Sequence, residues 1–482
     1  SMLAASKADL LAFGKGEATI VAIARRLAAG QPVTALRELR GVAYLLGASE
    51  TLPVWPGETL VLPSLEDVTR DPTAFARMTR TFHHETNPFN AKRLTQAHGD
   101  RTLVLNPPCL PIGEAEMDAI YDLSYTRRPH PRYAEPIPAH TMIKDSVQIM
   151  RGCFGGCTFC SITMHEGRVI QSRSPRSVLA EVQAIAADPA FKGTISDLGG
   201  PTANMYQMRC TRPEVEAVCK RLSCIHPTIC KLLGTSHAPT IELMRRARAV
   251  PGVKRVHIAS GIRMDLANLD DAYVDELVTH HVGGHLKVAP EHQSDRVLAL
   301  MKKPSHREFE TFAGKFRRAS KRAGKEQYLV PYFIASHPGS RVEDMIELAV
   351  FLKKHGYRPR QVQDFIPAPM DIATCIYHTG IDPLTMAPVD TVKKLRDRQT
   401  QRALMQFFEP RNWFVVHKAL VDAGRRDLIG SAKRCLIPAA PPPEALAAKR
   451  QEATEATHVH AEDAGTRPTI GYRPDRKGAR RR

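Results

Sequence analysis

The chain has 482 residues, of which 43% are hydrophobic, and it carries a formal net charge of +18. This length and apolar content indicate a globular protein with either one large domain and appendages or two to three smaller domains. No apolar run approaches the roughly 18 residues of a membrane-spanning helix, and the first residues lack the order of a secretory signal. We therefore expect a cytoplasmic protein with no membrane partner.

Two features of the composition point to partners. Ten cysteines in so long a chain make a poor disulfide scaffold and favour metal binding in a reducing compartment. The basic excess suits a nucleic-acid partner, because clustered cations release counterions when they neutralise phosphates. Part of this excess lies in the last ten residues, so a solvated basic tail is the alternative interpretation. The basic residues of that tail are Arg473, Arg476, Lys477, Arg480, Arg481 and Arg482.

The N-terminal part is predicted to hold one clear helix. Residues 17–29 place apolar side chains on one face, and the pattern stops at Gly30, which can adopt the left-handed conformation of a helix cap. Residues 61–145 are rich in proline and lack a clear periodicity. We expect them to be a connector with local structure.

From about residue 146, short β-branched runs alternate with amphipathic helices. Such alternation predicts parallel strands, in either a doubly wound sheet or a barrel. Six units with reactive residues after the first strand favour a barrel, which gathers such residues at the carboxyl ends of its strands. We therefore predict an α/β fold in which residues 146–370 form a partial barrel. The expected strands are 147–150, 194–198, 253–260, 285–289, 328–335 and 361–366.

Helix signals complete this outline. Ser174 is the expected N-cap of the helix after the first strand, and a capping box that starts at Ser340 opens a helix expected to end at Gly356. Residues 371–437 are typical of a helical C-terminal extension. Residues 438–482 are rich in proline, alanine and charged side chains, so we expect a disordered basic tail.

The most informative stretch contains three cysteines within eight residues, Cys153, Cys157 and Cys160, directly after the first predicted strand. Their Cys-x3-Cys-x2-Cys spacing lets one short loop hold three corners of an iron–sulfur cubane and leaves the fourth iron open. A structural zinc site or three buried thiols are the alternatives. Zinc normally takes four protein ligands, and the nearest further candidate is His165, five residues beyond the third cysteine.

Two motifs end the second and third predicted strands. Gly199, Gly200 and Pro201 follow the second strand, where small residues let the backbone approach a ligand closely. Ser260 and Arg263 follow the third strand, where a hydroxyl and a guanidinium can hold ribose hydroxyls and a carboxylate. Ordinary turns with a surface charge are the alternative for both.

The fourth and fifth strands end in further candidates. Glu291 and His292 follow the fourth strand, where a buried carboxylate could hold a ribose or transfer a proton. A structural role is equally open for the histidine. Residues 336–339 follow the fifth strand and could position an adenine through backbone groups.

Together these motifs resemble the radical S-adenosylmethionine (SAM) superfamily and, more narrowly, its YgiQ-type proteins, from about residue 7 to about residue 437. The resemblance implies a partial (β/α)6 TIM-like barrel, a 4Fe-4S cluster on the three cysteines, and SAM on the open iron. It also implies that seven residues contact the cofactor. These are Phe159, Gly199, Gly200, Pro201, Ser260, Arg263 and Glu291.

The resemblance carries two further expectations. Family members have an additional N-terminal domain, which we expect to be nearly all missing here, so that residues 1–60 are its remnant. His165 and Arg168 belong to the family pattern and, like His292, could reach a substrate. A structural ion-pair role for the first two is equally open.

A second group of four cysteines lies within about twenty residues after the second strand. A thiolate-rich site suits an auxiliary iron–sulfur cluster or a zinc ion. The intervals match no standard spacing, and cysteine is also a common buried residue, so incidental burial is the alternative. The four residues are Cys210, Cys219, Cys224 and Cys230.

These patterns lead to three functional hypotheses. The first is an enzyme that cleaves SAM reductively and uses the resulting 5'-deoxyadenosyl radical to abstract hydrogen from an unidentified substrate, with an electron donor protein as partner. The second narrows the substrate to RNA, held by the basic surface. The third is an iron–sulfur or zinc-binding scaffold without turnover.

Overall fold

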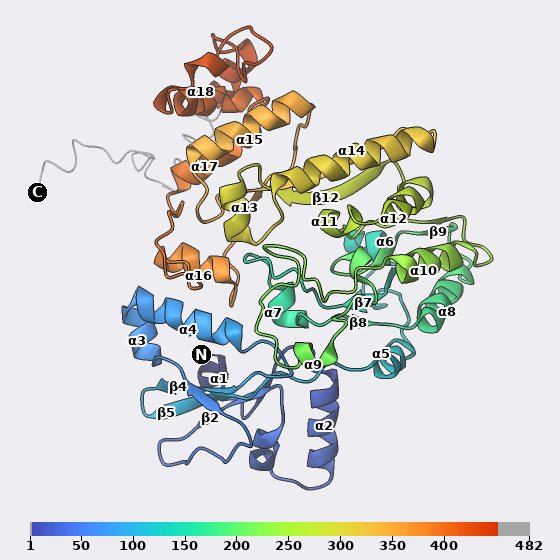
Figure 1. Ribbon diagram of the computed structural model, residues 1–482, viewed down its shortest axis with the longest axis vertical. Helices are drawn as coiled ribbons and strands as arrows, with labels where there is room; N and C mark the ends of the chain where they lie inside the picture. Colours follow the sequence, from blue (N-terminus) through green and yellow to red (C-terminus); the bar gives the residue numbers. More distant parts are fainter. Residues whose placement is uncertain (1, 452–482) are drawn as a thin grey trace, which may run out of the picture. The chain divides into compact units, whose positions relative to one another are not determined.

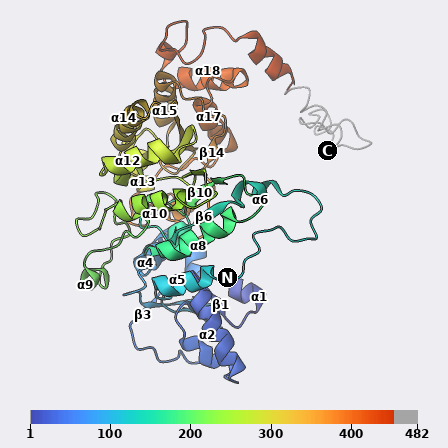
Figure 2. The same ribbon diagram turned by 90° about the vertical axis from the view of Figure 1, so that its right-hand side faces the viewer.

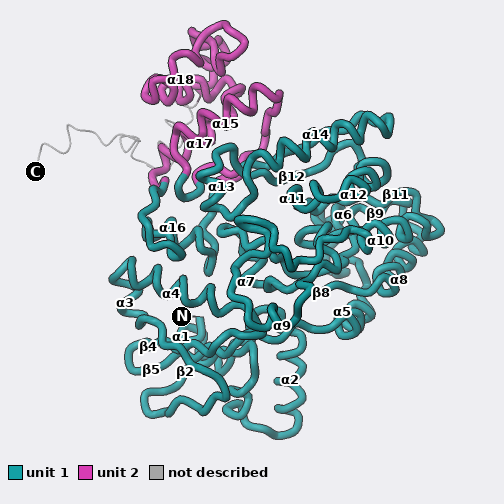
Figure 3. Tube along the Cα trace, viewed as in Figure 1, with its two compact units in different colours: residues 1–333, 337–339, 365–391 teal, residues 334–336, 340–364, 392–482 magenta. Residues whose placement is uncertain are grey.

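The computed structural model describes residues 2–451. The chain divides into two compact units, drawn in two colours in Figure 3. One unit holds residues 1–333, 337–339 and 365–391, and the other holds residues 334–336, 340–364 and 392–482. No helix in the described range is long and apolar enough to cross a membrane.

The N-terminal part of the first unit contains a five-stranded sheet in the order β1-β2-β5-β4-β3 (Figure 1). All pairs are antiparallel except the parallel pair of β3 and β4. Strand β2, which lies between β1 and β5, reads Val-Ala-Tyr-Leu-Leu and is buried along its whole length, because apolar clusters cover both of its faces. The strands are β1 (Leu11–Ala12), β2 (Val42–Leu46), β3 (Thr59–Val61), β4 (Arg93–His98) and β5 (Arg101–Leu105).

This sheet corrects the prediction for the N-terminal part. Its strands come from both sides of residue 60, so residues 1–60 are not a separate remnant and residues 61–105 are not a mere connector. The strands are short and several are half-exposed, which weakens the period-two signal that a sequence would show. The predicted helix is confirmed as α2 (Glu17–Ala28), followed by Gly30 with a positive φ of 79°.

Further helices belong to the N-terminal part or pack against its helices. Helix α4 begins with Asp71 as N-cap and a proline at its first position, and it packs against α3 and α16. The Nε2 atom of His83, near the end of α4, lies 2.9 Å from the carbonyl oxygen of Met370. These helices are α1 (Met2–Ser6), η1 (Val33–Glu38), α3 (Leu65–Arg70), α4 (Pro72–His84), α5 (Glu114–Tyr121), α6 (Pro138–Ile143) and α16 (Ile372–Thr379).

The following part alternates strands and helices, as predicted. The strand pairs are parallel and follow chain order: β6 with β10, β9 with β11, β12 with β13, and β13 with β14. That order is the one a partial barrel requires, and the closure of six units into a barrel stays a prediction. These strands are β6 (Ser146–Gln148), β9 (Thr194–Ile195), β10 (Asp197–Gly199), β11 (Arg255–Val256), β12 (His285–Glu291), β13 (Tyr328–Ala335) and β14 (Gln363–Asp364).

Helices cover this parallel region. Ser174 caps α8 as predicted, since its side chain accepts a hydrogen bond from the Ser177 N–H. Helix α8 packs against β6 and α10 (Figure 2). The helices are α7 (Ile162–Glu166), α8 (Pro175–Ala186), η2 (Ala203–Met205), α9 (Pro213–Glu216), α10 (Ala238–Arg248), α11 (Met264–Ala267), α12 (Asp271–Glu276), η3 (Leu277–His281), α13 (Asp295–Met301) and α14 (His306–Arg322).

The third predicted strand is much shorter than expected. Only Arg255–Val256 form β11, although residues 253–260 were predicted to be extended. The backbone N–H groups of Ala259 and Ser260 donate to the carboxylate of Asp197, 2.7 and 3.2 Å away. A side chain therefore replaces strand pairing at the end of this run.

The second unit is mainly helical. Its helix α15 ends at Gly356 as predicted, but its capping box joins Arg341 and Asp344, because Ser340 instead donates its hydroxyl to Gln401. The helices of the predicted extension are α16 in the first unit and α17 and α18 in the second. The elements of this unit are α15 (Val342–His355), α17 (Leu395–Met405), η4 (Pro410–Asn412), α18 (Trp413–Asp422) and η5 (Arg426–Leu428).

The predicted disordered tail begins too early. Residues 443–451 are helical, and Ala445 is fully buried. The indole N–H of Trp413 also donates to the carbonyl oxygen of Pro438. Disorder is therefore wrong for residues 438–451, and residues 452–482 lie outside the described range.

Candidate active site

The three-cysteine loop leaves the short strand β7 (Met150–Arg151) and returns to the chain through β8 (Gln171–Ser172), which pairs with β7. Two glycines let the loop turn tightly. Gly152 and Gly156 have φ of 88° and 65°, and a Cβ atom on either would collide with a backbone carbonyl. The path of the loop therefore requires glycine at both positions.

Backbone hydrogen bonds tie the loop to neighbouring elements. Thr158 donates its N–H to the carbonyl oxygen of Met301 and its hydroxyl to that of Leu300, at the end of α13. Its own carbonyl oxygen accepts from the N–H of Ala373 in α16. Cys153 donates its N–H to Gly167, 3.0 Å away. These bonds hold the cysteines among elements that are distant in sequence.

The three cysteines of this loop are half-buried. Burial and the neighbouring Cys157 raise the pKa of Cys153, and burial together with the same neighbour raises the pKa of Cys160 to about 12. The raised pKa values mean that Cys153 and Cys160 favour the protonated thiol until cations neutralise the thiolates. The donor set thus fits the irons of a 4Fe-4S cluster, whose binding releases thiol protons.

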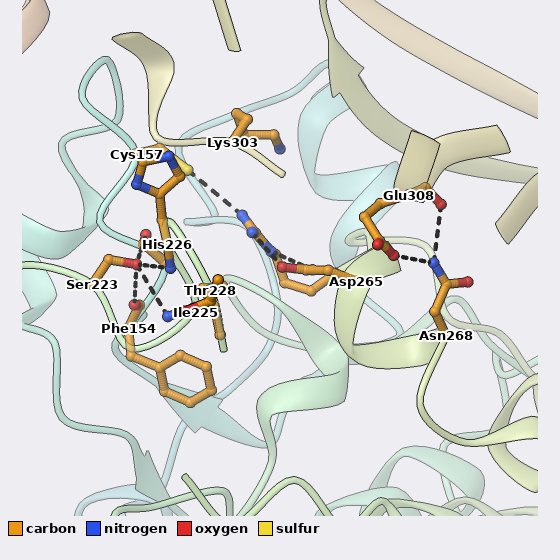
Figure 4. Close-up of polar contacts among 12 residues, drawn as sticks. Phe154, Cys157, Ser223, Ile225, His226, Thr228, Asp265, Asn268, Lys303 and Glu308 are labelled. Atoms are coloured by element: carbon orange, nitrogen blue, oxygen red, sulfur yellow. Dashed lines mark hydrogen bonds and ion pairs between the residues drawn. The ribbon is translucent and has the colours of Figure 1, made fainter. Parts of the chain in front are cut away.

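Arg263 is the nearest basic group to these thiols. Its buried guanidinium makes two hydrogen bonds of 3.0 and 2.9 Å with the Asp265 carboxylate, and its Nη1 donates to the Cys157 sulfur at 3.7 Å (Figure 4). The sequence predicted a SAM contact for this residue, which stays a prediction. The structure shows a cation that is fixed by a carboxylate and directed at a cluster ligand.

The ends of the second and third strands meet as the motifs predicted. Gly200 donates its N–H to the Ser260 hydroxyl at 3.4 Å. A Cβ atom on Gly199 would lie 2.9 Å from the Asp197 carboxylate oxygens, and one on Gly200 would lie 2.7 Å from the Met150 carbonyl oxygen. Close packing against the Met150 carbonyl requires a glycine at position 200, and at Gly199 the side chains of Ser260 and Asp197 occupy the place of a Cβ atom.

Asp197 is a site residue that the sequence analysis missed. The sequence shows no acidic residue directly after Gly199 and Gly200, yet this carboxylate stands two residues before Gly199, at the start of the same strand. Burial raises its pKa. Its position in the strand was a usable signal, because alternate residues of a strand share one face.

The fourth and fifth strands deliver the remaining candidates. Glu291 has a positive φ of 68°, and its buried carboxylate lies 3.5 Å from the ammonium of Lys303. His292 accepts backbone N–H groups of Gln293 and Ser294 at its Nδ1 atom, which is the geometry of a structural role. The ring of Phe159 lies edge-on to that of buried His337, with centroids 5.8 Å apart.

A small cavity of about 20 Å³, open to solvent, lies beside the loop and is lined by Cys157 and Cys160. Arg168 also lines it, whereas His165 is exposed. Lys302 also lines this cavity, and the sequence analysis did not single it out as a site residue. Its backbone is in the left-handed conformation, with φ of 53°. Burial lowers the pKa of Lys302 to about 8 and raises that of Asp371, on the opposite wall, to about 6.

The second cysteine group is only partly assembled. Burial raises the pKa of Cys224, and the nearby Cys219 and Cys230 raise it further. The backbone of Cys210 instead forms an isolated antiparallel β-bridge with that of Leu233. Nowhere in residues 2–451 do three or more His, Cys, Asp or Glu side chains converge as ligands of a single ion. The absence of such a group concerns mononuclear metal sites only, because the thiolates of a cubane bind different irons and need not converge on one point. The auxiliary site stays a prediction.

Three protein families match this chain. Residues 1–146 match the Radical SAM N-terminal family, residues 147–352 the Radical SAM superfamily, and residues 360–478 a domain of unknown function, DUF3362. The N-terminal domain is therefore present, and the expectation that it is nearly all missing is wrong. The predicted radical SAM domain is confirmed.

Curated relatives extend over most of the chain. A UPF0313 protein of Bradyrhizobium diazoefficiens is 50% identical over 467 residues, and one of Rhodopseudomonas palustris is 49% identical over the same length. Each alignment covers 92% of this chain and 69% of the relative. UPF0313 protein YgiQ of Escherichia coli is 44% identical over 511 residues, covering 94% of this chain and 69% of that protein.

Solved structures show weaker likeness. The radical SAM methyltransferase TsrM of Kitasatospora setae, with cobalamin and a [4Fe-4S] cluster bound, gives a TM-score of 0.35 at 14% identity and covers 58% of this chain and 49% of its own. The cobalamin-dependent radical enzyme OxsB gives 0.41 at 12% identity, covering 77% of this chain and 39% of its own. Neither likeness is strong enough to assign a site.

Proposed function

Because the chain belongs to the UPF0313 family of YgiQ-type proteins and carries a radical SAM domain, we propose that it is an enzyme that cleaves SAM reductively. A 4Fe-4S cluster with SAM, when bound, supplies the electron that breaks the sulfur–C5' bond and yields methionine and a 5'-deoxyadenosyl radical, which abstracts hydrogen from the substrate. The substrate is unidentified, and a separate donor protein supplies the electron.

The three cysteines would hold the cluster. Their loop is fixed by Gly152 and Gly156 and by the bonds of Thr158, so the thiols are positioned without a large ordering cost on binding. The fourth corner has no cysteine from this loop, which leaves it for SAM. Arg263, directed at the Cys157 sulfur, would stabilise the negative charge that the ligand gains on reduction.

The strand ends would hold SAM. Gly199 and Gly200 would accept the methionine end along their backbone, and the buried Asp197 carboxylate two residues before Gly199 would receive its ammonium group. Ser260 and Glu291 are the candidates for the ribose hydroxyls. The buried Nε2 atom of His337 has no hydrogen-bond partner in the described range, so it is free to bond the nucleoside.

One observation carries this proposal: the cysteine loop and the ends of the second and third strands lie together, since Arg263 contacts Cys157 and Ser260 contacts Gly200. The test is the anaerobically reconstituted chain incubated with SAM and dithionite. We expect 5'-deoxyadenosine from the wild type and none from Cys157→Ala. A wild type that holds about four irons and yet produces no 5'-deoxyadenosine would favour a scaffold without turnover.

RNA is a second candidate substrate class, favoured by the outer face of α14. Arg317, Arg318 and Lys321 are exposed there, and clustered cations bind phosphate backbones in a salt-dependent manner. We propose that this face binds tRNA. Replacing all three with alanine should weaken binding to total tRNA and flatten its salt dependence, as measured by filter binding. Binding that the triple variant leaves unchanged would remove RNA from consideration at this face.

A further inference from the structure

A second and larger cavity lies between the N-terminal sheet and the cysteine loop, within the first unit. Its volume is about 110 Å³ and it is partly open to solvent, so a small organic ligand could place one end in it and leave the rest outside. Its walls come from the segment before α2, the end of α4, strands β4 and β5, and residues 163–171. The apolar lining includes Phe13, Phe82, Leu94 and Leu105.

Lys15 is the unusual polar group of this cavity. It lines the wall just before α2, and its Nζ atom is buried without any hydrogen-bond partner in the described range. An ammonium group that has lost its water and has no acceptor costs free energy. Burial lowers its pKa to about 8, so the group is still mostly protonated at pH 7.

The carboxylates of the cavity do not supply the missing hydrogen-bond acceptor for Lys15. Glu166 accepts the N–H of Gly152 at 2.8 Å. Glu85 accepts the N–H of Lys92 at 2.8 Å and the ammonium of Lys220 at 2.9 Å. Glu166 favours the charged form of Lys15 through space without bonding it. The Lys15 ammonium therefore stands in the cavity wall as a donor without an acceptor in the described range.

We propose that this cavity binds an amphipathic anion, with its carboxylate, sulfonate or phosphate on Lys15 and its apolar body against the aromatic and leucine side chains. The site adjoins the cavity beside the cluster ligands, because the two share Thr86, Thr163, Met164 and Arg168. An occupant would reach the neighbourhood of the cysteine loop from the side of the N-terminal domain. The proposal assigns a ligand class and does not depend on the radical reaction.

The test uses two fluorescent probes of nearly equal shape on the full chain. One is 8-anilinonaphthalene-1-sulfonate, an apolar anion, and the other is N-phenyl-1-naphthylamine, which lacks the sulfonate. Lys15→Met should weaken the binding of the anionic probe by ~10-fold or more, which is the contribution of one charged hydrogen bond. It should leave the binding of the neutral probe unchanged. Lys192→Met, at an exposed lysine outside the cavity lining, is the matched control and should change neither.

A second variant tests the location. Ala18 lines the cavity on α2, so Ala18→Trp should fill the space and reduce the binding of both probes. Lys15→Arg, which keeps the charge, should retain the anionic probe. The proposal is overturned if Lys15→Met binds the anion as well as the wild type, if it loses both probes equally, or if Ala18→Trp keeps both.

Discussion

The two cysteine groups differ in how the chain fixes them. Cys153, Cys157 and Cys160 stand in one short loop that two positive-φ glycines turn and three neighbouring elements hold in place. The second group is spread over a longer irregular excursion, where Cys219 uses its carbonyl oxygen to accept the amides of Asn87 and Asn90. The first group is thus confined to one short, tightly turned loop, whereas the second group spans about twenty residues.

The largest expected effect separates the two groups directly. Cys157→Ala removes one of three cluster ligands, so iron should fall from about four per chain to near zero after anaerobic reconstitution. Cys224→Ala, the matched variant in the second group, should keep about four irons. Iron and sulfide analysis with absorption spectra measures both. An equal loss of iron in the two variants would show that both cysteine groups belong to one metal site, which contradicts the difference described above.

The next effect concerns the buried cation beside the loop. Arg263→Met leaves the Asp265 carboxylate buried and unpaired, so the free energy of unfolding should fall by about 3–5 kcal/mol. The double variant Arg263→Met with Asp265→Leu should recover much of this loss, because both charges are gone. Urea unfolding of the chain, followed by circular dichroism, gives the values. A single variant as stable as the wild type would show that the pair is not buried as described.

A smaller effect tests the glycines. Gly156→Ala should lower the free energy of unfolding by about 2–3 kcal/mol, because it combines a positive φ with a collision at the Leu222 carbonyl. Gly167→Ala is the matched control in the same loop: its φ is 85°, but its Cβ would meet no atom within 4 Å. It should cost about 1 kcal/mol. Equal losses of unfolding free energy in the two variants would mean that the backbone around Gly156 shifts easily to accommodate a Cβ atom.

The smallest effect belongs to the second group. Asn87 donates its amide to the carbonyl oxygens of Glu216 and Cys219, so Asn87→Ala should cost about 1–2 kcal/mol of unfolding free energy. Iron content should stay at the wild-type value, because Asn87 holds the second cysteine group and not the loop of the three cluster ligands. Thermal unfolding and iron analysis of the same sample check both. A drop in iron would show that this excursion supports a cluster after all.

The sequence predicted the parts that depend on local signals. Helix α2 with its terminal Gly30, the Ser174 cap and strand β13 agree with the residue pattern, because side-chain periodicity and capping act over a few residues. The cysteine spacing and the family resemblance carried the site. These features need no knowledge of distant contacts.

The missed features depend on contacts between distant residues. The N-terminal sheet pairs strands on both sides of residue 60, with little periodic signal in each. The third strand ends early because the Asp197 side chain takes the N–H groups of Ala259 and Ser260. The Arg263 guanidinium faces Cys157 across more than a hundred residues. Spacing along the chain cannot show such contacts.

The most direct test of the account is the electron paramagnetic resonance spectrum of the anaerobically reduced cluster, recorded without SAM and then with SAM labelled with nitrogen-15 at its amino group. The account predicts that SAM changes the signal and that the label couples to the cluster, because one iron lacks a cysteine. An intact four-iron signal that is unchanged by SAM, with no coupling to the label, would contradict it.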